Sequence, residues 1–311
     1  MDGVTDLPFR RLIREVSGGD APLFVSEFLS AGSSLFLTLA NLRATRFDKE
    51  EEPFCMQVFG HNAERLAGAA LKAQELGASS VELNAGCPAR RVAGKGSGSG
   101  LLKDLPNLRK VLQAMKAAVK IPLFLKSRIG WDENSICIDE VLEIAEGEGV
   151  EQLTIHGRTK EQCYKGLANW DAIGDIAAKA KIPIIGNGDI NNAQIALNRM
   201  KNYGVKGIAI GRGALQNPWI FSQIADAVSG KEPAKITPSQ VCSMVIRYEK
   251  LLRADSLREG QILGKLKQLS SRMFKGDFRH AILRTQNIQD FLSHCFNLSA
   301  NAFSFPYSVG S

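Results

Sequence analysis

Short apolar runs alternate with amphipathic stretches along the first 235 residues of the chain. The runs have the length of buried strands, and the stretches between them, such as 63–76 and 105–119, repeat apolar residues at helical spacing. Strands that alternate with helices in this way are typical of a parallel sheet. The expected strands are LFVSEF (23–28), FCMQVF (54–59), SVELN (80–84), PLFLKSR (122–128), QLTIHGR (152–158), IPIIGNG (182–188) and GIAIGRG (207–213).

Seven strands in this rhythm predict an α/β fold, a (β/α)₈ TIM barrel that lacks its first strand. The opening MDGVTDLPFRRLIREV reads as a loop and a helix, with Thr5 or Asp6 as the cap and Pro8 in the first turn. This is the second half of a βα unit whose strand would precede Met1. Because an open barrel edge leaves backbone groups without partners, we expect the N-terminus to be truncated or mis-assigned.

Beyond Ile236 the strands stop and amphipathic segments follow at 239–253, 260–276 and 279–295. These segments predict about three helices, and the last residues, NAFSFPYSVGS, read as an unstructured tail. We therefore expect a barrel domain over residues 1–235 and a small all-helical domain with a flexible tail over 236–311.

Polar residues close nearly every apolar run. The C-terminal ends of barrel strands carry the chemistry of this fold, so the residues there are candidates for a site. A single one of them, such as His156, is more often a structural residue, but the recurrence along one edge favours a catalytic or binding function. These residues are Glu27, Gln57, Asn84 with Cys87, Lys126 with Arg128, His156 with Arg158, Asn187 with Asp189, and Gly211 with Arg212.

The last two runs end in the glycine turns IIGNGDI and AIGRGAL. Glycines let backbone N–H groups approach an anion closely, and the loops after strands 7 and 8 are the usual phosphate site of a TIM barrel. Together with Lys126, these turns favour a phosphorylated ligand.

Positive charge is concentrated in the last quarter of the chain. The net charge is +7, and from Ile236 to Ser311 ten Lys and Arg stand against five Asp and Glu. This asymmetry indicates a polyanionic partner or, alternatively, a solvated helical surface.

Composition excludes several classes of protein. No apolar run reaches the length of a membrane span, and no secretory signal opens the chain. Six scattered cysteines without a C-x-x-C pair argue against a structural zinc site or a disulfide framework. We expect a cytoplasmic protein with reduced thiols and no metal.

Several motifs together give the chain its resemblance to the tRNA-dihydrouridine synthases, an FMN-dependent family. They are MDGVTDLPFR, ELNAGCP, K-S-R at Lys126, HGRTKEQCY from His156, GNGD at Asn187 and GRGAL at Gly211. The resemblance extends from Met1 to about Gln286, and the Ala-Pro pair that precedes the opening motif in the family is absent. The GSGSGLLK loop and VSEFL are most similar to the branch that acts on U16.

The resemblance implies a role for each matching residue. It implies FMN as cofactor, NADPH or NADH as electron donor, and tRNA as substrate. Cys87 would supply a proton, and Asn84 and Tyr164, with Glu27 nearby, would position the uridine. The FMN contacts would be Met1, Asp2, Gln57, Lys126, His156, Asn187, Gly188, Asp189, Gly211 and Arg212.

Two basic regions would contact the RNA. The loop after Cys87 carries Arg90, Arg91 and Lys95 among glycines that would let it close over the substrate. In the helical domain the candidate phosphate contacts are Arg247, Lys265, Lys267, Arg272 and Arg279.

The implied chemistry explains a cysteine at a strand end. Reducing the C5–C6 bond of uracil requires a hydride at C6 and a proton at C5 from an acid on the opposite face. Cys87 suits this task if it stays protonated, and so does not sit against a lone cation. The alternative is a small buried hydrophobe, the commoner fate of a cysteine.

Three other functions stay open. They are a flavin barrel acting on a free pyrimidine, such as a dihydroorotate dehydrogenase; an aldolase with Lys126 as Schiff-base nucleophile; and a non-catalytic RNA-binding relic. Bound flavin would separate the dihydrouridine synthase and the flavin barrel for a free pyrimidine from the aldolase and the RNA-binding relic. The modified uridine and the choice of nicotinamide donor are not readable from the residues, and we expect a monomer.

Overall fold

The computed structural model describes residues 1, 3–19, 23–32 and 45–300, with side chains up to residue 297. The chain forms two compact units. The first, called the sheet unit, comprises Met1–Leu7, Pro22–Ile190 and Asn198–Ile210. The second, called the helical unit, comprises Pro8–Ala21, Asn191–Leu197 and Gly211–Ser311.

Every strand of the sheet is parallel to its neighbours, as the alternating pattern predicts. The order is β1-β3-β4-β5-β6-β7-β8, and β2 also pairs with β3. The strands are β1 (Phe24–Val25), β2 (Leu29–Ser30), β3 (Phe54–Phe59), β4 (Ser80–Ala85), β5 (Leu123–Arg128), β6 (Gln152–His156), β7 (Ile184–Asn187) and β8 (Gly207–Ala209).

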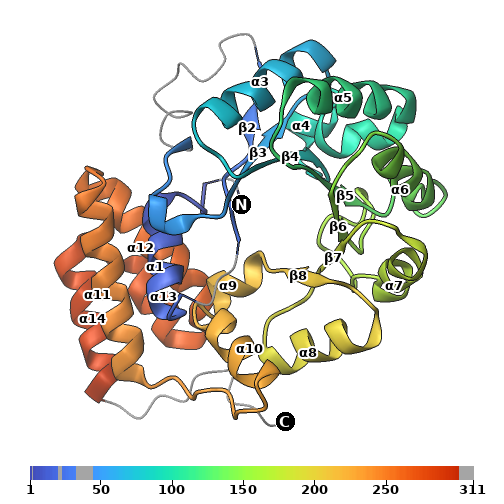
Figure 1. Cartoon of the computed structure of the whole chain (residues 1–311). Coiled ribbons are helices and arrows are strands. Elements are labelled where there is room, and N and C mark those ends of the chain that lie inside the picture. Colours follow the sequence, from blue (N-terminus) through green and yellow to red (C-terminus); the bar gives the residue numbers. More distant parts are fainter. Residues whose placement is uncertain (2, 20–22, 33–44, 301–311) are drawn as a thin grey trace. The chain divides into compact units, whose positions relative to one another are not determined.

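The central strands are buried along almost their whole length. All six residues of β4 are buried, and so are the first five of β3. Near-continuous apolar runs are what a parallel sheet covered by helices requires. In Figure 1 the strands β3 to β7 curve around a common centre and the helices of this unit lie outside them. The α/β barrel-like fold with helices after it is confirmed.

The run LFVSEF differs from its prediction as a single strand. Only its residues Phe24–Val25 form a strand, β1, and the second short strand, β2, follows the run at Leu29–Ser30. Both strands pair with β3 and so share one position of the sheet. At the break, the Ser26 hydroxyl donates to the carbonyl of Glu27, 2.7 Å away, and accepts a hydrogen bond from the Gln57 N–H at 2.9 Å. The strand expected upstream of Met1 stays a prediction.

Helices follow the strands with caps that are visible in the sequence. The side chains of Asn62, Asp104 and Asn169 each accept a hydrogen bond from a backbone N–H of the first turn. The helices that connect strands are α3 (Ala63–Glu75), α4 (Arg90–Ala93), α5 (Leu105–Ala118), α6 (Ile138–Gly147), α7 (Trp170–Lys179) and α8 (Ala193–Asn202), with 3₁₀ helices η1 (Lys49–Glu51) and η2 (Gly98–Lys103).

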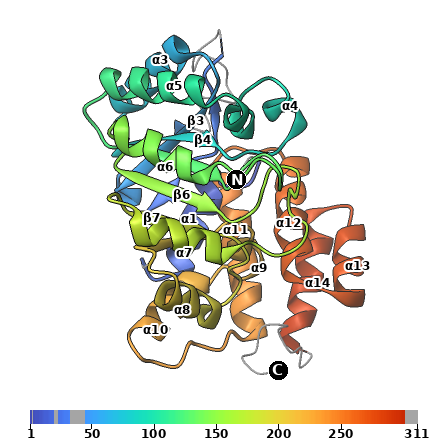
Figure 2. The ribbon, with the colours of Figure 1, turned by 90° about the vertical axis from the view of Figure 1, so that its right-hand side faces the viewer.

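Helices α11 to α14 run side by side in the helical unit (Figure 2). The third amphipathic segment forms two helices rather than one, because Thr285 bonds back to the Ile282 carbonyl and Asn287 caps a new helix through the N–H of Asp290. The helices of this unit include α9 (Arg212–Gln216), α10 (Ile220–Val228), α11 (Pro238–Ala254), α12 (Glu259–Met273), α13 (Gly276–Arg284) and α14 (Ile288–Ala300).

Helix α1 (Leu7–Val16) contributes Phe9 and Glu15 to the helical unit. The ring of Phe9 meets Tyr248 of α11 edge to face, with centroids 6.2 Å apart. Glu15 accepts two hydrogen bonds from Arg247, at 2.7 and 2.6 Å. The helical unit thus draws on three stretches of sequence, and the domain boundary expected between residues 235 and 236 stays a prediction.

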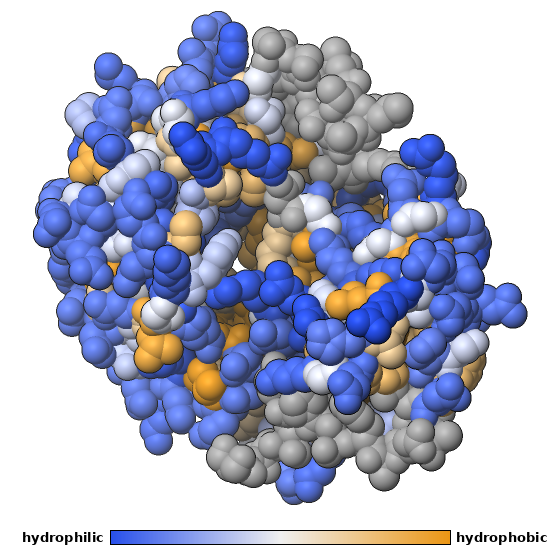
Figure 3. Space-filling model, turned by 180° about the vertical axis from the view of Figure 1, so that it is seen from behind, coloured by the Kyte–Doolittle hydropathy of each residue, from blue (hydrophilic) through white to orange (hydrophobic). Residues whose placement is uncertain are grey.

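Hydrophilic residues prevail on the surface seen in Figure 3, and hydrophobic side chains form small separate groups there. In the part of the chain that the structure describes, no helix combines the length and the apolar character needed to cross a membrane.

Candidate functional site

The register of the sheet brings the predicted strand-end residues to one edge. Gln57 of β3 lies beside Glu82 of β4, and Asn84 lies beside Lys126 of β5. His156 of β6 is in register with Asn187 of β7. Residues that are far apart in the sequence therefore form one row at the C-terminal ends of parallel strands.

A chain of side-chain hydrogen bonds connects three of these residues to Cys87. The Nε2 of Gln57 donates to Oε1 of Glu82 at 2.5 Å, and the Nδ2 of Asn84 donates to Oε1 of Gln57 at 2.8 Å. The Oδ1 of Asn84 then accepts from the backbone N–H groups of Gly86, at 3.0 Å, and Cys87, at 2.8 Å. The predicted residues Gln57, Asn84 and Cys87 thus belong to one connected structure.

The carbonyl of Cys87 is held from the other side of the loop. It accepts from the hydroxyl of Ser99 at 2.8 Å and from the Ser99 N–H at 3.2 Å. Between them Gly98 has φ +55°, and a Cβ there would lie 3.1 Å from the Cβ of Cys87. Only glycine combines this backbone conformation with such a close approach. Cys87 itself is half-buried.

The basic loop after Cys87 contains ordered secondary structure. Arg90 and Arg91 lie on the short helix α4, Lys95 follows it, and all three side chains are exposed. The glycine-rich sequence that predicts a flexible loop forms the 3₁₀ helix η2, whose residues Gly98 to Leu102 are buried. The structure thus presents three cations on a defined turn beside Cys87.

Arg128 is a buried cation next to the Cys87 loop. Its guanidinium donates to the carbonyls of Gly86 (2.8 Å), Thr159 (2.7 Å) and Cys163 (2.9 Å). Burial lowers the pKa of Arg128, and nearby Tyr164 opposes this shift. Three backbone carbonyl groups thus surround the guanidinium. This residue fastens the Cys87 loop to the loop after β6.

Lys126 starts a second line of hydrogen bonds. Its ammonium donates to Oδ1 of Asn187 at 3.0 Å, and Nδ2 of Asn187 donates to the carbonyl of Ala209 at 2.7 Å. Burial lowers the pKa of Lys126 to about 8, while the Glu82 carboxylate acts in the opposite direction. Lys126 is therefore a cation whose charge is sensitive to its surroundings near neutral pH.

Glu82 is a residue to which the sequence assigned no function. Its side chain is buried, and burial raises its pKa, opposed by the charge of Lys126 and by hydrogen bonds from Gln57 and Thr154. The signal was present in the sequence: Glu82 is a charge inside an apolar strand, two residues before Asn84 and so on the same face.

His156, Gly188 and Asp189 come together around Arg158. The Nη1 of Arg158 lies 3.2 Å from Nε2 of His156, and Nη2 donates to both oxygens of Asp189, at 2.7 and 2.8 Å. Asp189 also accepts from the N–H of Ala168 at 2.7 Å. The carboxylate of Asp189 is thus bound by the protein itself, through the strand-end candidate Arg158 and the backbone of Ala168.

Gly188 has φ +131°, and a Cβ there would lie 2.5 Å from the Cβ of Ala168 and 3.2 Å from the ring of His156. No larger residue fits at this turn without displacing its neighbours.

Other predicted residues lie outside this network. Tyr164 is 54% exposed, with the guanidinium of Arg128 5.7 Å from its ring centroid. Glu27 is half-buried in the segment between β1 and β2. The Met1 amino group donates to the Thr5 hydroxyl at 2.6 Å, and Asp2 lies outside the described residues. Gly211 and Arg212, at the start of α9, belong to the helical unit.

The cations predicted in the helical unit differ in their surroundings. Lys267 donates to the carbonyl of Thr285 at 2.5 Å, Arg279 donates to that of Ser271 at 3.0 Å, and Lys265 is half-buried. Arg272 is exposed.

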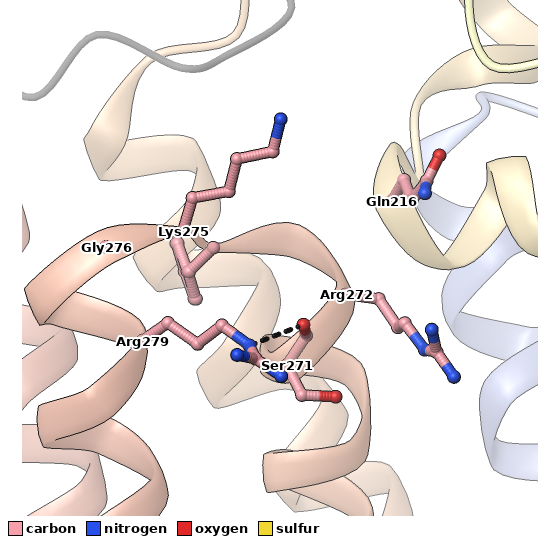
Figure 4. A pocket seen from close by; sticks show the side chains of 7 residues that line it. Gln216, Ser271, Arg272, Lys275, Gly276 and Arg279 are labelled. Carbon is pink, nitrogen blue, oxygen red and sulfur yellow. Dashed lines mark hydrogen bonds between the residues drawn. The ribbon is translucent and has the colours of Figure 1, made fainter.

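Arg272 and Arg279 line the same pocket of about 410 Å³ between α9, α12 and α13. Figure 4 shows Lys275 and Gln216 on opposite sides of this pocket and the hydrogen bond from Arg279 to Ser271 below them. Three cations and no acidic residue line it. The pocket was not predicted from the sequence, because its first and last lining residues, Gln216 and Arg279, are 63 positions apart.

All six cysteines are free thiols, and only Cys87 and Cys163 are not buried. Within the described ranges, no three His, Cys, Asp or Glu side chains are placed together as ligands for a metal ion.

Comparison with known proteins gives consistent matches. The sequence profile of the family described as dihydrouridine synthase (Dus) matches residues 1–298. A probable tRNA-dihydrouridine synthase of Rickettsia conorii is 40% identical over 225 residues, which are 72% of this chain and 67% of that protein. The tRNA-dihydrouridine synthase B of Pseudomonas syringae pv. tomato is 37% identical over 265 residues, which are 85% of this chain and 77% of that protein.

Among solved structures, histamine dehydrogenase from Rhizobium sp. 4-9 is similar with a TM-score of 0.53 at 12% sequence identity. The likeness covers 83% of this chain and 50% of that one, and it concerns the fold alone. The profile match over most of the length, with relatives of this identity and coverage, shows that the chain belongs to the dihydrouridine synthase family.

Proposed function

We propose that the protein reduces the C5–C6 double bond of specific uridines in tRNA to give dihydrouridine. The observation that carries this proposal is the hydrogen-bonded row of Gln57, Asn84 and Cys87 beside Lys126, at the C-terminal ends of the strands. The names of the relatives from Rickettsia conorii and Pseudomonas syringae, both described as acting on tRNA, support the same substrate.

The residues at this edge fit FMN. They include several hydrogen-bond donors: the ammonium of Lys126 and the amides of Gln57 and Asn187. His156 lies in register with Asn187 at the same edge. A flavin ring presents carbonyl oxygens and ring nitrogens that accept such bonds, and a nearby cation stabilises negative charge on the reduced ring. Asp189 would act by holding Arg158 in place, because its carboxylate already binds that guanidinium.

The proton is the task of Cys87. FMN, when bound and reduced, supplies the hydride that C6 of uracil receives. The Sγ–H of Cys87 would give its proton to C5, and Asn84 would fix the thiol by holding the N–H groups of Gly86 and Cys87. The exposed ring of Tyr164 would face the uracil, which must leave its base stack to reach the site.

Two basic surfaces would hold the tRNA. One is the turn with Arg90, Arg91 and Lys95, and the other is the helical domain, proposed as residues 236–311, with Lys265, Lys267, Arg272 and Arg279. The catalytic domain is proposed as residues 1–235, with Met1, Asp2, Gly188, Gly211 and Arg212 as further FMN contacts and Glu27 near the uridine.

The remaining features are proposed from the family resemblance. NADPH or NADH would reduce the flavin again, and the uridine would be U16. The protein would act as a monomer in the cytoplasm, without a metal.

Flavin content tests this function. Purified protein, reconstituted with flavin, should release FMN on denaturation, and Lys126→Ala should weaken FMN binding through loss of the cation. Lys110→Ala, at an exposed position of α5, serves as the control and should bind FMN like the wild type.

Release of FAD, or no flavin after reconstitution, would contradict the assignment. The lowered pKa of Lys126 also suits a Schiff-base lysine, so a colourless protein that borohydride traps on a carbonyl substrate would favour the aldolase function.

A further inference from the structure

Glu82 is a buried carboxylate at the centre of the candidate site, and the proposed reaction gives it no task. It lies in β4 two residues before Asn84, so both side chains are on one face of the strand. The groups that act on it come from three other strands of the sheet: Gln57 of β3, Lys126 of β5 and Thr154 of β6.

The carboxylate determines the direction of the hydrogen-bond chain. An ionised carboxylate only accepts, so Gln57 must turn its NH₂ group toward Glu82 and its carbonyl toward Asn84. Asn84 must then donate to Gln57 and point its own carbonyl at the backbone N–H groups of Gly86 and Cys87. The Glu82 carboxylate at one end of this series of hydrogen bonds and the backbone N–H groups at the other end require the same direction. The side-chain amides of Gln57 and Asn84 therefore have no competing orientation.

Glu82 also faces the second line of hydrogen bonds. Lys126, which donates to Asn187 and through it reaches the Ala209 carbonyl, is in register with Asn84 on the next strand, and the negative charge of Glu82 acts on its ammonium. The other charged group that acts on Lys126 is Arg128, which repels it. Glu82 thus begins the series of hydrogen bonds that ends at Cys87, and Lys126 begins the series that ends at Ala209 of β8.

Core packing does not require an ionisable group at this position. Buried charges carry a large desolvation cost, and well-packed apolar residues of similar volume often replace a buried ion pair without loss of stability. The hydrogen bonds and the charge of Glu82 therefore need an explanation beyond the fold.

We propose that Glu82 is a positioning residue: through Gln57 and Asn84 it holds the Cys87 loop in place, and its charge keeps Lys126 cationic. The part that concerns Lys126 and the flavin rests on the proposed function, whereas the part that concerns the Cys87 loop does not.

The loop is tested in the flavin-free protein. Glu82→Leu removes both acceptor and charge, while Glu82→Gln keeps an acceptor for Gln57. The alkylation rate of Cys87 by iodoacetamide is measured by mass spectrometry, with Cys163, the other partly exposed thiol, as internal reference. Glu51→Gln, at a second glutamate that is 3% exposed in the sheet unit, is the matched control.

We expect Glu82→Leu to change the Cys87 to Cys163 rate ratio by at least about fivefold, because local opening of the loop becomes easier. Glu82→Gln and Glu51→Gln should stay within about twofold of the wild type. Hydrogen exchange of the segment 84–90 should rise in Glu82→Leu alone. A Glu82→Leu protein with the wild-type ratio and exchange would overturn the positional role.

The charge is tested by FMN affinity as a function of pH, measured by quenching of flavin fluorescence. In the wild type, affinity should fall as Lys126 loses its proton near pH 8. In Glu82→Gln the fall should begin at lower pH, because the neighbouring negative charge is gone, and Glu51→Gln should follow the wild type. An unchanged midpoint in Glu82→Gln would overturn the role toward Lys126, and this test remains if Glu82→Leu does not fold.

The two proposals fail in different ways. If no variant and no wild-type protein binds FMN, the proposed function is wrong, while the alkylation ratio still decides the positional role of Glu82. If FMN binds to all proteins with one pH dependence and one Cys87 reactivity, the function stands and the role of Glu82 is refuted.

Discussion

Positively charged side chains are treated differently in the two units of the molecule. In the site of the sheet unit, Arg158 is 2% exposed and forms an ion pair with Asp189, and Lys126 is bound by Asn187. In the helical unit, Arg272 and Lys275 are exposed and line a pocket that has no acidic residue. The site thus fixes Lys126 and Arg158 in one place, whereas the pocket displays Arg272 and Lys275 to the solvent.

This difference separates two kinds of recognition. A buried charge with fixed partners acts over short distances in a low dielectric and can stabilise a reacting group at a defined atom. Exposed cations bind a polyanion mainly by releasing its counterions, which requires no unique geometry and weakens with salt. We therefore expect substitutions of the buried charges in the site to affect the chemical step or folding, and substitutions at the pocket to affect RNA binding.

The largest effect is expected from Cys87→Ala. Single-turnover reoxidation of the reduced flavin by unmodified tRNA should slow by roughly 10²–10⁴-fold, the usual contribution of a positioned general acid. Flavin reduction by NADPH should be unchanged, because that half-reaction needs no proton donor for uracil. Cys163→Ala, at the other partly exposed cysteine, should behave like the wild type. Wild-type reoxidation in Cys87→Ala would show that the proton comes from another group.

Loss of a buried ion pair should come next. Asp189→Ala leaves the guanidinium of Arg158 buried without its carboxylate, and the free energy of unfolding should fall by about 3 kcal/mol. The exposed pair of Glu15 and Arg247, with side chains 41% and 50% exposed, is the comparison, and Glu15→Ala should cost less than about 1 kcal/mol. Urea denaturation measures both. Equal losses in the two variants would contradict the distinction between buried and displayed charge.

Charge reversal at the pocket should weaken RNA binding while leaving the site intact. Arg272→Glu combined with Lys275→Glu should reduce tRNA affinity by roughly tenfold or more and make the salt dependence of binding shallower by about 1–2 in log–log slope. FMN content should not change. The control, Lys231→Glu with Lys250→Glu, alters the same charge at exposed positions of the helical unit outside the pocket. An equal loss of tRNA affinity in this control would show that the net charge of the protein, rather than the pocket, determines RNA binding.

The last expected effect, which is small near neutral pH, is that of pH on flavin reduction. With a pKa of about 8 in the folded protein, Lys126 is charged below pH 8 and neutral above it. If the cation supports reduction, the rate should be constant at lower pH and fall by about tenfold for each unit well above the pKa. Lys126→Arg, which stays charged, should remove this fall. A wild-type rate that is flat to pH 9.5 would mean that the charge of Lys126 does not matter.

The fold could be predicted from local patterns, and so could the proximity of some residues of the candidate site. The apolar runs gave the parallel sheet, and Asn84 and Cys87 are close because they are only three residues apart. Asn287, a residue favoured at helix starts, marked a helix boundary that the amphipathic pattern alone did not separate. In each case, a few adjacent residues contain the whole signal.

The partners of the buried charges could not be predicted in this way. Gln57 and Glu82 are 25 residues apart, and Arg158 and Asp189 are 31 apart. An alternating strand shows that Glu82 lies on the face of Asn84, but only the register of β3 on β4 places the amide of Gln57 between them.

The sequence by itself determined the parallel α/β sheet, the helices after it, the basic C-terminal quarter and the family motif around Cys87, because periodicity, charge and short motifs are properties of neighbouring residues. Only the tertiary structure decided the direction of the hydrogen bonds from Glu82 to Cys87, the ion pair of Arg158 with Asp189, and the contact of Phe9 with Tyr248. These contacts depend on which atoms meet across strands and helices, and that follows from register and packing rather than from the order of residues along the chain.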